Sequence, residues 1–238
     1  MTTKPSDAAS AALARLLIIM ERLRAPGGCP WDAEQTPESL KPYIIEEAYE
    51  VVEAIDQGDV EDLRDELGDL LLQVVFLARI HEERENFSMF DVIQAIADKL
   101  VRRHPHVFAG TPIGDARMLA DQWEAIKRAE KPETTSEHPL ERLPRQLPAL
   151  QKAGKLAQKT GFNEATGGLA GLLKQAERDL KAVGRSLARD EEEPSREHLG
   201  SLLFTLAGLA TTLDQDAEDI LRGHNQRVLS HHIKAKAE

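Results

Sequence analysis

The hydrophobic positions between residues 44 and 80 predict two amphipathic helices joined by a short turn. In the first helix, apolar residues recur three or four positions apart, and the turn falls at Gln57-Gly58-Asp59. The second helix carries a wider apolar face. Because the turn is short, we expect the two helices to be antiparallel neighbours. The predicted core faces consist of Ile44, Ala48, Val51 and Ile55, and of Leu63, Leu67, Leu70, Leu71, Val74, Leu77 and Ala78.

Acidic residues lie beside the first apolar face and inside the second. Glu47 and Glu50 are three positions apart, and Glu66 and Asp69 repeat this spacing on the second helix. Glu46 lies one turn before Glu50. Facing carboxylates repel each other unless a cation lies between them. Because the cluster offers only oxygen ligands, with no adjacent His or Cys, it suits a hard divalent cation, Mg²⁺ or Mn²⁺.

The same acids have a second interpretation, in which they face water and pair with Arg64 and Lys41. Ion pairs of this kind are common on helix surfaces. Against it, Asp69 lies within the apolar run LGDLLLQVVFLA, where an acid without a partner is costly to bury. The spacing of the acids alone leaves both interpretations open.

The acids and the segments around them resemble the MazG branch of the all-α nucleoside triphosphate pyrophosphohydrolases. The resemblance covers most of residues 10–158 and implies an all-α fold with a four-helix-bundle-like core that dimerisation completes. It also implies Mg²⁺-dependent hydrolysis of nucleoside triphosphates to monophosphate and pyrophosphate, in a house-cleaning or nucleotide-pool role. The matching motifs are Glu46-Glu47-x-x-Glu50, Glu66-x-x-Asp69, GCPWDAEQT at 28–36, RRHPHVF at 102–108 and WEAIK at 123–127.

The resemblance assigns roles to single residues of the acid cluster. Glu47, Glu50, Glu66 and Asp69 become metal ligands. Glu46 is either a further ligand or the group that orients or deprotonates the attacking water. Attack by this water at the α phosphorus makes pyrophosphate the leaving group, while bound metal ions neutralise the acids and lower the pKa of the water.

Substrate contacts are expected outside the acid cluster. Lys99 and Arg103, at the end of a helix predicted over residues 90–101, taken alone favour the helix dipole. The resemblance makes both of them, with Lys127, contacts to phosphate oxygens. Trp123 is then expected to contact the base, whereas Trp31 either stacks on the base or caps the helical bundle.

Two functional alternatives remain open at this point. The first is a narrower pyrophosphohydrolase acting on dUTP or phosphoribosyl-ATP, because the enzymes for these substrates carry a similar acid signature. The second is a non-enzymatic helical protein whose acids bind metal for assembly. A Walker A loop is absent from the sequence, which excludes a P-loop enzyme.

The second part of the chain reads as a degenerate copy of the first. A proline-rich stretch, residues 131–148, predicts a linker between a catalytic domain, residues 1–130, and a repeat over residues 149–238. In the repeat, TGFN at 160–163 echoes CPWD at 29–32, and residues 172–183 and 196–210 align with 44–55 and 64–78. We therefore expect activity from the first domain only. The five acids are replaced by Lys174, Gln175, Arg178, His198 and Ser201.

Composition narrows the choice of partners and compartment. The formal net charge of −11 over 238 residues argues against a general nucleic-acid or anionic-membrane binder. The single cysteine, Cys29, is compatible with a reducing cytosol, and no secretory signal is visible. The longest uncharged apolar run, residues 199–213, is too short for a membrane span. We expect a cytoplasmic homodimer without a nucleic-acid or membrane partner.

Overall fold

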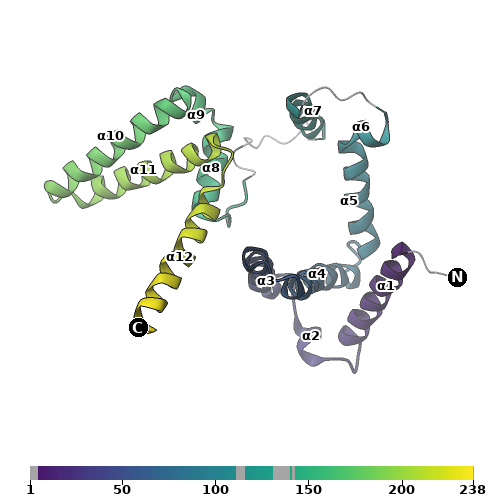
Figure 1. Cartoon of the computed structure of the whole chain (residues 1–238). Coiled ribbons are helices and arrows are strands. Elements are labelled where there is room, and N and C mark those ends of the chain that lie inside the picture. Colours follow the sequence, from purple (N-terminus) through teal and green to yellow (C-terminus); the bar gives the residue numbers. More distant parts are fainter. Residues whose placement is uncertain (1–4, 111–115, 131–139, 141–142, 238) are drawn as a thin grey trace. The chain divides into compact units, whose positions relative to one another are not determined.

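The computed structural model describes residues 5–110, 116–130, 140 and 143–237, and this part of the chain is all-α (Figure 1). The described residues contain helices and turns and no strand, which confirms the predicted fold class. The chain divides into two compact units, residues 1–132 and 133–238. Most of the predicted linker, residues 131–139 and 141–142, lies outside the described residues, so the domain boundaries remain a prediction.

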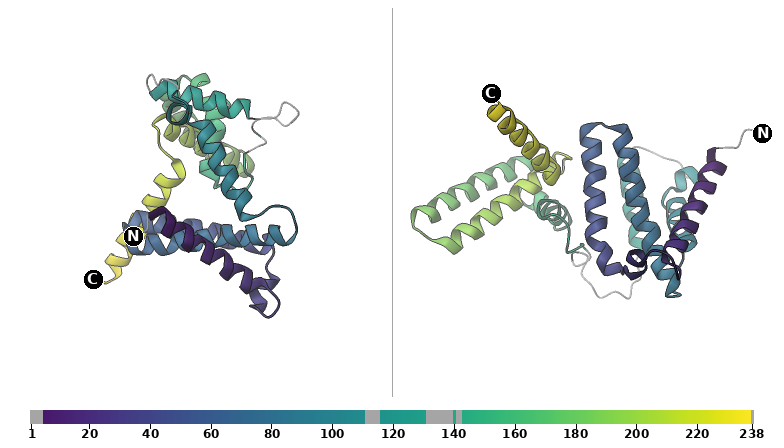
Figure 2. Two further views of the ribbon diagram at one scale, coloured as in Figure 1. Left: turned by 90° about the vertical axis from the view of Figure 1, so that its right-hand side faces the viewer. Right: turned by 90° about the horizontal axis from the view of Figure 1, so that it is seen from below.

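The first unit is built on an antiparallel pair of long helices, α3 and α4, which lie side by side (Figure 2). Helix α1 packs against α4 and α2, and α5 follows α4 after a short turn. The elements of this unit are α1 (Pro5–Arg24), α2 (Pro30–Glu34), α3 (Pro37–Gln57), α4 (Val60–Glu83), α5 (Met89–Arg103), α6 (Pro105–Phe108) and α7 (Ala116–Ala129).

The turn between α3 and α4 lies where the sequence predicts it. Gly58 has a left-handed backbone with φ 73°, and its N–H donates to the carbonyls of Ala54 and Ile55. The Asp59 carboxylate then caps α4 by accepting the backbone N–H groups of Glu61 and Asp62. These two caps reverse the chain within two residues and set α3 against α4.

Helix α3 begins earlier than the hydrophobic pattern indicates. Thr36 and Ser39 form a capping box, and Pro37 occupies the first turn, where its missing N–H does no harm. The helix continues through Pro42 to Gln57. Residues 30–34, within the GCPWDAEQT motif, form the short helix α2.

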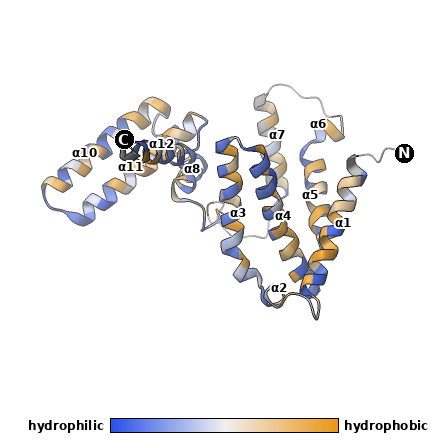
Figure 3. Cartoon of the chain, turned by 60° about the horizontal axis from the view of Figure 1, so that its bottom comes forward, coloured by the Kyte–Doolittle hydropathy of each residue, from blue (hydrophilic) through white to orange (hydrophobic). Residues whose placement is uncertain are grey.

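The core of the first unit lies between α1, the start of α3 and the C-terminal half of α4. Its buried residues are Met20, Leu40, Val75, Phe76 and Ile80. Figure 3 shows the same division along α4, whose N-terminal half is hydrophilic and whose C-terminal half is hydrophobic. Burial of each of these larger side chains stabilises the fold by about 1.5–3 kcal/mol.

The predicted core faces are therefore only partly correct. Ile55 and Leu67 are 57% and 50% exposed, and Leu71 and Val74 are about as open. The physical reason is that α1 covers only the C-terminal part of α4 in the single chain. Exposed apolar residues of this kind on a helix pair indicate that a further helical layer packs against them.

Helix α5 is amphipathic, and its apolar side is largely exposed. Ser88 is the N-cap of this helix and forms a capping box with Asp91. Phe90 is 70% exposed, and Ile96 and Leu100 are each 47% exposed. In Figure 1, α5 runs away from the α3–α4 pair towards α6 and α7.

The second unit repeats the long antiparallel pair with α10 and α11, and α8 packs against α11. Buried Asp179 accepts hydrogen bonds from Thr205 and Gln175 at 2.9 and 2.8 Å. His198 shares a 3.0 Å hydrogen bond with Ser186 and is partly buried. The elements are α8 (Ala149–Lys159), α9 (Phe162–Ala165), α10 (Gly168–Ala188), α11 (Glu192–Thr212) and α12 (Ala217–Ala237).

Candidate metal centre

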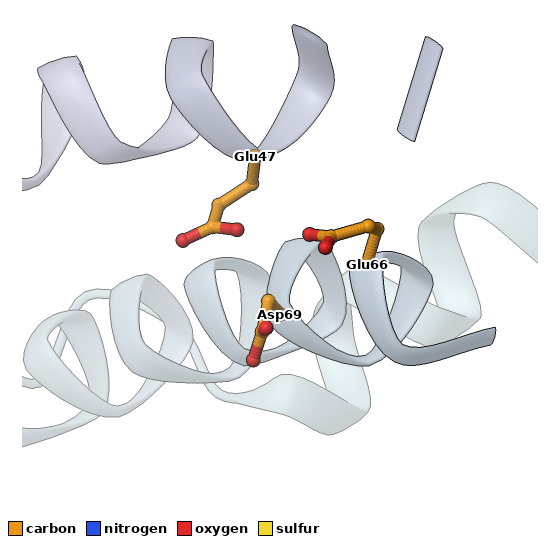
Figure 4. A group of neighbouring side chains, drawn as sticks. All are labelled: Glu47, Glu66 and Asp69. Carbon is orange, nitrogen blue, oxygen red and sulfur yellow. The ribbon is translucent and has the colours of Figure 1, made fainter. Parts of the chain in front are cut away.

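Three of the predicted ligands converge between α3 and α4. Glu47 reaches from α3 towards Glu66 and Asp69 on α4 (Figure 4). Each residue offers one carboxylate oxygen, and these oxygens all lie within 4.8 Å of one another. Oxygens on opposite sides of a Mg²⁺ ion are about 4.2 Å apart. The three acids therefore fit a hard cation after a shift of a fraction of an ångström.

The electrostatics of the cluster also favour a cation. Burial, followed by the charges of Asp69 and Glu50, raises the pKa of Glu47. Burial and the charge of Glu50, with smaller contributions from Asp62, Asp69 and Asp65, raise the pKa of Glu66. Among the described residues, the charges that shift these two pKa values are all carboxylates. A bound cation would remove this repulsion.

The competing interpretation, in which the acids pair with nearby cations, is not what the structure shows for Arg64. Its guanidinium bonds to Asp65 at 2.9 Å and pairs with Glu61, both on the exposed start of α4. Arg64 therefore pairs with acids at the exposed start of α4 and not with the acid cluster. The charge of Lys41 helps to lower the pKa of Glu38, although the largest cause of that lowering is a backbone hydrogen bond.

Two expectations about the acids need correction or refinement. Asp69 is exposed in the single chain, because α1 does not reach this end of α4 and leaves it open to solvent. Glu50 adjoins the cluster, where its charge adds to the effect of burial in raising the pKa of Glu47, but it is outside the convergent group of three. Glu46 is exposed and also lies outside that group.

The predicted phosphate contacts lie on another part of the unit. Lys99 and Arg103 are near the end of α5, and within the described residues α5 packs against α4, α6 and α7. Arg103 forms an ion pair with Glu130 at 2.6 Å, and Arg102 contacts the same carboxylate at 2.7 Å. The two arginines lower the pKa of Glu130 to about 2, with the Arg103 hydrogen bond the largest cause.

The predicted Trp-Lys helix is present as α7. Trp123 is half-buried; its ring meets His104 edge-on at 4.9 Å, and the Arg103 guanidinium lies 5.8 Å from its centroid. The side chain of Lys127 lies outside the described part of the structure. In the single chain, Arg103 and Trp123 therefore lie together near the end of α5, apart from the acids on α3 and α4.

Trp31 lies beside α3, the helix that carries Glu47. It is on α2, and its ring meets that of Tyr43 on α3 edge-on, with 6.2 Å between the centroids. Arg24 holds this region, because its guanidinium donates to the carbonyls of Asp32 and Gln35 and pairs with Glu83 at 2.8 Å. The Arg24 side chain is only 7% exposed.

Sequence reasoning did not single out three residues that contact the predicted site residues or the loop beside them: Tyr43, Arg24 and Glu130. Tyr43 could have been found, since it lies one helical turn before Glu47. The roles of Arg24 and Glu130 depend on contacts across 59 and 27 residues of sequence. No local pattern indicates such contacts.

In the second unit, the corresponding helix pair carries none of these acids. Gln175 and Arg178 hydrogen-bond to each other on α10 at 2.5 Å. The buried carboxylate of α10, Asp179, is one position from the place of Arg178 and accepts a hydrogen bond from Thr205. The arrangement gives no support to a second metal centre at this pair.

The match to a protein-family model falls within the first unit. The sequence model of the MazG nucleotide pyrophosphohydrolase domain matches residues 35–108, which include all five acids. A nucleoside triphosphate pyrophosphohydrolase from Escherichia coli (strain K12) is 42% identical over 217 residues, covering 90% of this chain and 82% of the relative.

A second relative and one solved structure are also similar. The nucleoside triphosphate pyrophosphohydrolase/pyrophosphatase MazG from Thermotoga maritima is 43% identical over 210 residues, 87% of this chain and 78% of the relative. The crystal structure of a mazG-related protein from Thermotoga maritima is 29% identical, with a TM-score of 0.42, and covers 48% of this chain and 98% of that one. On the extent and identity of the sequence matches, the chain belongs to the MazG nucleotide pyrophosphohydrolase family.

Proposed function

We propose that this protein hydrolyses (deoxy)nucleoside triphosphates to the monophosphate and pyrophosphate, and that the first unit carries the activity. The observation that supports this most directly is the meeting of Glu47, Glu66 and Asp69 between two helices, with other carboxylates around them. The relatives named as nucleoside triphosphate pyrophosphohydrolases are similar to this chain over both units, but the acids are present only in the first.

The chain's own residues divide the work as follows. Glu47, Glu66 and Asp69 hold Mg²⁺, with Mn²⁺ as a possible substitute, and Glu50 completes the acidic surroundings. When bound, the ion supplies positive charge for the phosphates and lowers the pKa of a water molecule. Glu46, exposed and outside the convergent group, is the candidate that remains for a further ligand or for the group that orients or deprotonates the water attacking the α phosphorus.

The phosphate contacts are proposed to come from a second copy of the chain. In one copy, Lys99 and Arg103 lie on α5, which runs away from the acids. The apolar side of α5 and the open faces of α3 and α4 are exposed in the single chain, with Phe90 at 70% and Ile55 at 57%. A homodimer would cover these faces and bring the cations of one copy to the acids of the other.

Phosphorus NMR after incubation with one nucleoside triphosphate and Mg²⁺ tests the reaction. Formation of monophosphate and pyrophosphate together, abolished by Glu66→Gln, establishes attack at the α phosphorus. Orthophosphate and diphosphate would instead identify a γ-phosphatase and contradict the proposal. A panel that includes dUTP and phosphoribosyl-ATP then shows whether the enzyme is general, as a nucleotide-pool or house-cleaning role requires.

We propose a cytoplasmic location without a nucleic-acid or membrane partner. Cys29 is a free cysteine, which is compatible with the proposed cytoplasmic location. Within the described residues, the helices all fall short of the length and apolarity needed to cross a membrane.

A further inference from the structure

We propose that Trp31 and Tyr43 form the platform on which the aromatic base of the nucleoside triphosphate stacks. This inference rests on the proposed function for the position of the triphosphate. It assigns Tyr43 a role in substrate binding and chooses Trp31, rather than Trp123, as the indole beside the base.

The position of Tyr43 relative to the metal ligands is the first support. Tyr43 is four residues before Glu47 on α3, so its ring lies on the same side of the helix, one turn of about 5.4 Å away. In a nucleotide, only the ribose separates the base from the α phosphate. A triphosphate held at the acids would thus place its base within reach of this ring.

The two rings are open to a ligand. Trp31 is 53% exposed and Tyr43 is 36% exposed. The rings meet edge to face, with 72° between their planes, so neither covers the other as a stacked pair would. Exposed aromatic faces that bind bases are typical of proteins that take many nucleotides, since every base has a π face.

The platform is held in place before any ligand binds. The buried Arg24 guanidinium donates to the carbonyls of Asp32 and Gln35, which flank the end of α2. Gln35 in turn donates to the Trp31 carbonyl at 2.9 Å. A fixed site loses less conformational freedom on binding than a mobile one.

The degenerate repeat provides a comparison within the same chain. In the alignment that replaces the acids, Tyr43 corresponds to Gly171 and Trp31 to Phe162. Phe162 packs edge-on against Phe204, with 5.1 Å between the centroids. The repeat therefore lacks the Trp–Tyr pair as well as the metal-binding acids, whereas the buried Ala54 of the first unit is kept as Ala182.

The surroundings of Trp123 favour Trp31 for this role. Trp123 already meets His104 edge-on and lies beside the Arg103 guanidinium. Its helix, α7, packs only against α5 among the described elements. In the proposed homodimer Trp123 would reach the acids only together with Arg103 of a second copy, and its ring already has His104 and Arg103 as partners, whereas Trp31 belongs to the chain that supplies the acids.

Equilibrium binding tests the platform without requiring turnover. The probes are α,β-methylene-ATP, which resists cleavage at the α phosphorus, and inorganic tripolyphosphate, which has no base. Both are titrated with Mg²⁺ by calorimetry into the full-length wild type, Tyr43→Ala and Tyr43→Phe. Tyr49→Ala is the matched control, because Tyr49 is the other tyrosine of the chain and lies on a different side of α3.

We expect Tyr43→Ala to weaken the methylene analogue by about 5- to 100-fold and to leave tripolyphosphate unchanged. Tyr43→Phe keeps the ring and should bind both probes like the wild type, as should Tyr49→Ala. Equal weakening of the two probes by Tyr43→Ala, or no weakening of either, overturns the platform. Phosphorus NMR on the wild type separately reports whether the proposed reaction itself is wrong.

A fluorescence titration identifies the indole. In Trp123→Phe, Trp31 is the one remaining tryptophan. The methylene analogue should quench or shift its emission, and tripolyphosphate should not. Emission that does not respond to a saturating concentration of the analogue, established by calorimetry, excludes Trp31 from the base site.

Discussion

Arg103 donates two hydrogen bonds to one carboxylate oxygen of Glu130, from Nη2 at 2.6 Å and from Nε at 3.1 Å. This is the geometry in which a guanidinium also binds a phosphate. Because the pKa of Glu130 is about 2, the carboxylate stays ionised throughout the range in which an enzyme is assayed. A triphosphate that uses Arg103 must therefore compete with Glu130.

Glu130→Gln should lower KM for a nucleoside triphosphate by about 3- to 10-fold. In this variant Arg103 breaks only a weaker hydrogen bond, to a neutral amide, when it binds the phosphate. Little change in kcat is expected. Steady-state kinetics measure both values, and Glu82→Gln, which removes a carboxylate bonded to Arg79, is the control. A higher KM in Glu130→Gln would show that Glu130 positions Arg103 for the substrate.

Removal of one metal ligand should nearly abolish turnover while the helices stay intact. Loss of an outer-shell partner typically costs about 10- to 100-fold, so Glu66→Gln or Asp69→Asn should cost at least about 100-fold in kcat. Circular dichroism checks the fold, and Glu61→Gln, on the exposed start of the same helix, is the control. Activity close to wild type in either ligand variant would defeat the metal assignment.

The repulsion among the acids predicts an unusual dependence of stability on pH. The raised pKa values of Glu47 and Glu66 mean that the folded state binds their protons more tightly than the unfolded state. The free energy of unfolding of the metal-free protein should therefore fall as pH rises from the ordinary value of 4.5 towards neutral. Carboxylates with lowered pKa values, such as Glu83, lose their contribution only below that range.

Urea unfolding at several pH values, with a chelator or with Mg²⁺, measures this effect. Saturating Mg²⁺ should remove most of the slope between pH 5 and 7, and Glu47→Gln should reduce it without metal. The comparison of the wild type with Glu47→Gln cancels the contribution of the ionisable groups that the two proteins share. Identical slopes in the wild type and Glu47→Gln would be evidence against the electrostatic account.

Mixed dimers test whether the second copy supplies the cations. Asp69→Asn and Arg103→Ala should each be inactive alone. When they are unfolded together and refolded at equal amounts, about a quarter of the wild-type activity should return, because half of the dimers then contain one intact site of two. No recovery, in a sample shown to contain mixed dimers, would place Arg103 and the acids of one chain in the same site.

Arg24 should stabilise the first unit and its base platform together. Arg24→Ala leaves Glu83 without its closest cation and frees two carbonyls of the loop, and should lower the free energy of unfolding by about 2–4 kcal/mol. Arg24→Lys should recover only part of this loss, because an ammonium cannot make the same set of bonds. Thermal or urea unfolding measures the difference, and Arg64→Ala provides an exposed control expected to change it by less than about 0.5 kcal/mol.

The sequence by itself determined the helical architecture, the α3–α4 turn and the identity of the acids. These features depend on local causes: apolar residues at helical spacing, a glycine that adopts positive φ, and caps such as Asp59 and Ser88. The spacing of Glu66 and Asp69 alone already puts both on one side of α4.

Only the tertiary structure decided which of the candidate groups meet. Glu47 joins Glu66 and Asp69 because two helices pack at one register, whereas Arg103 pairs with Glu130 because α5 leads away from the acids. Asp69 is exposed although its neighbours in sequence are apolar, since burial depends on whether another element covers that face of the helix. Contacts across long stretches of sequence depend on the packing of whole elements, and hydrophobic spacing carries no information about that packing.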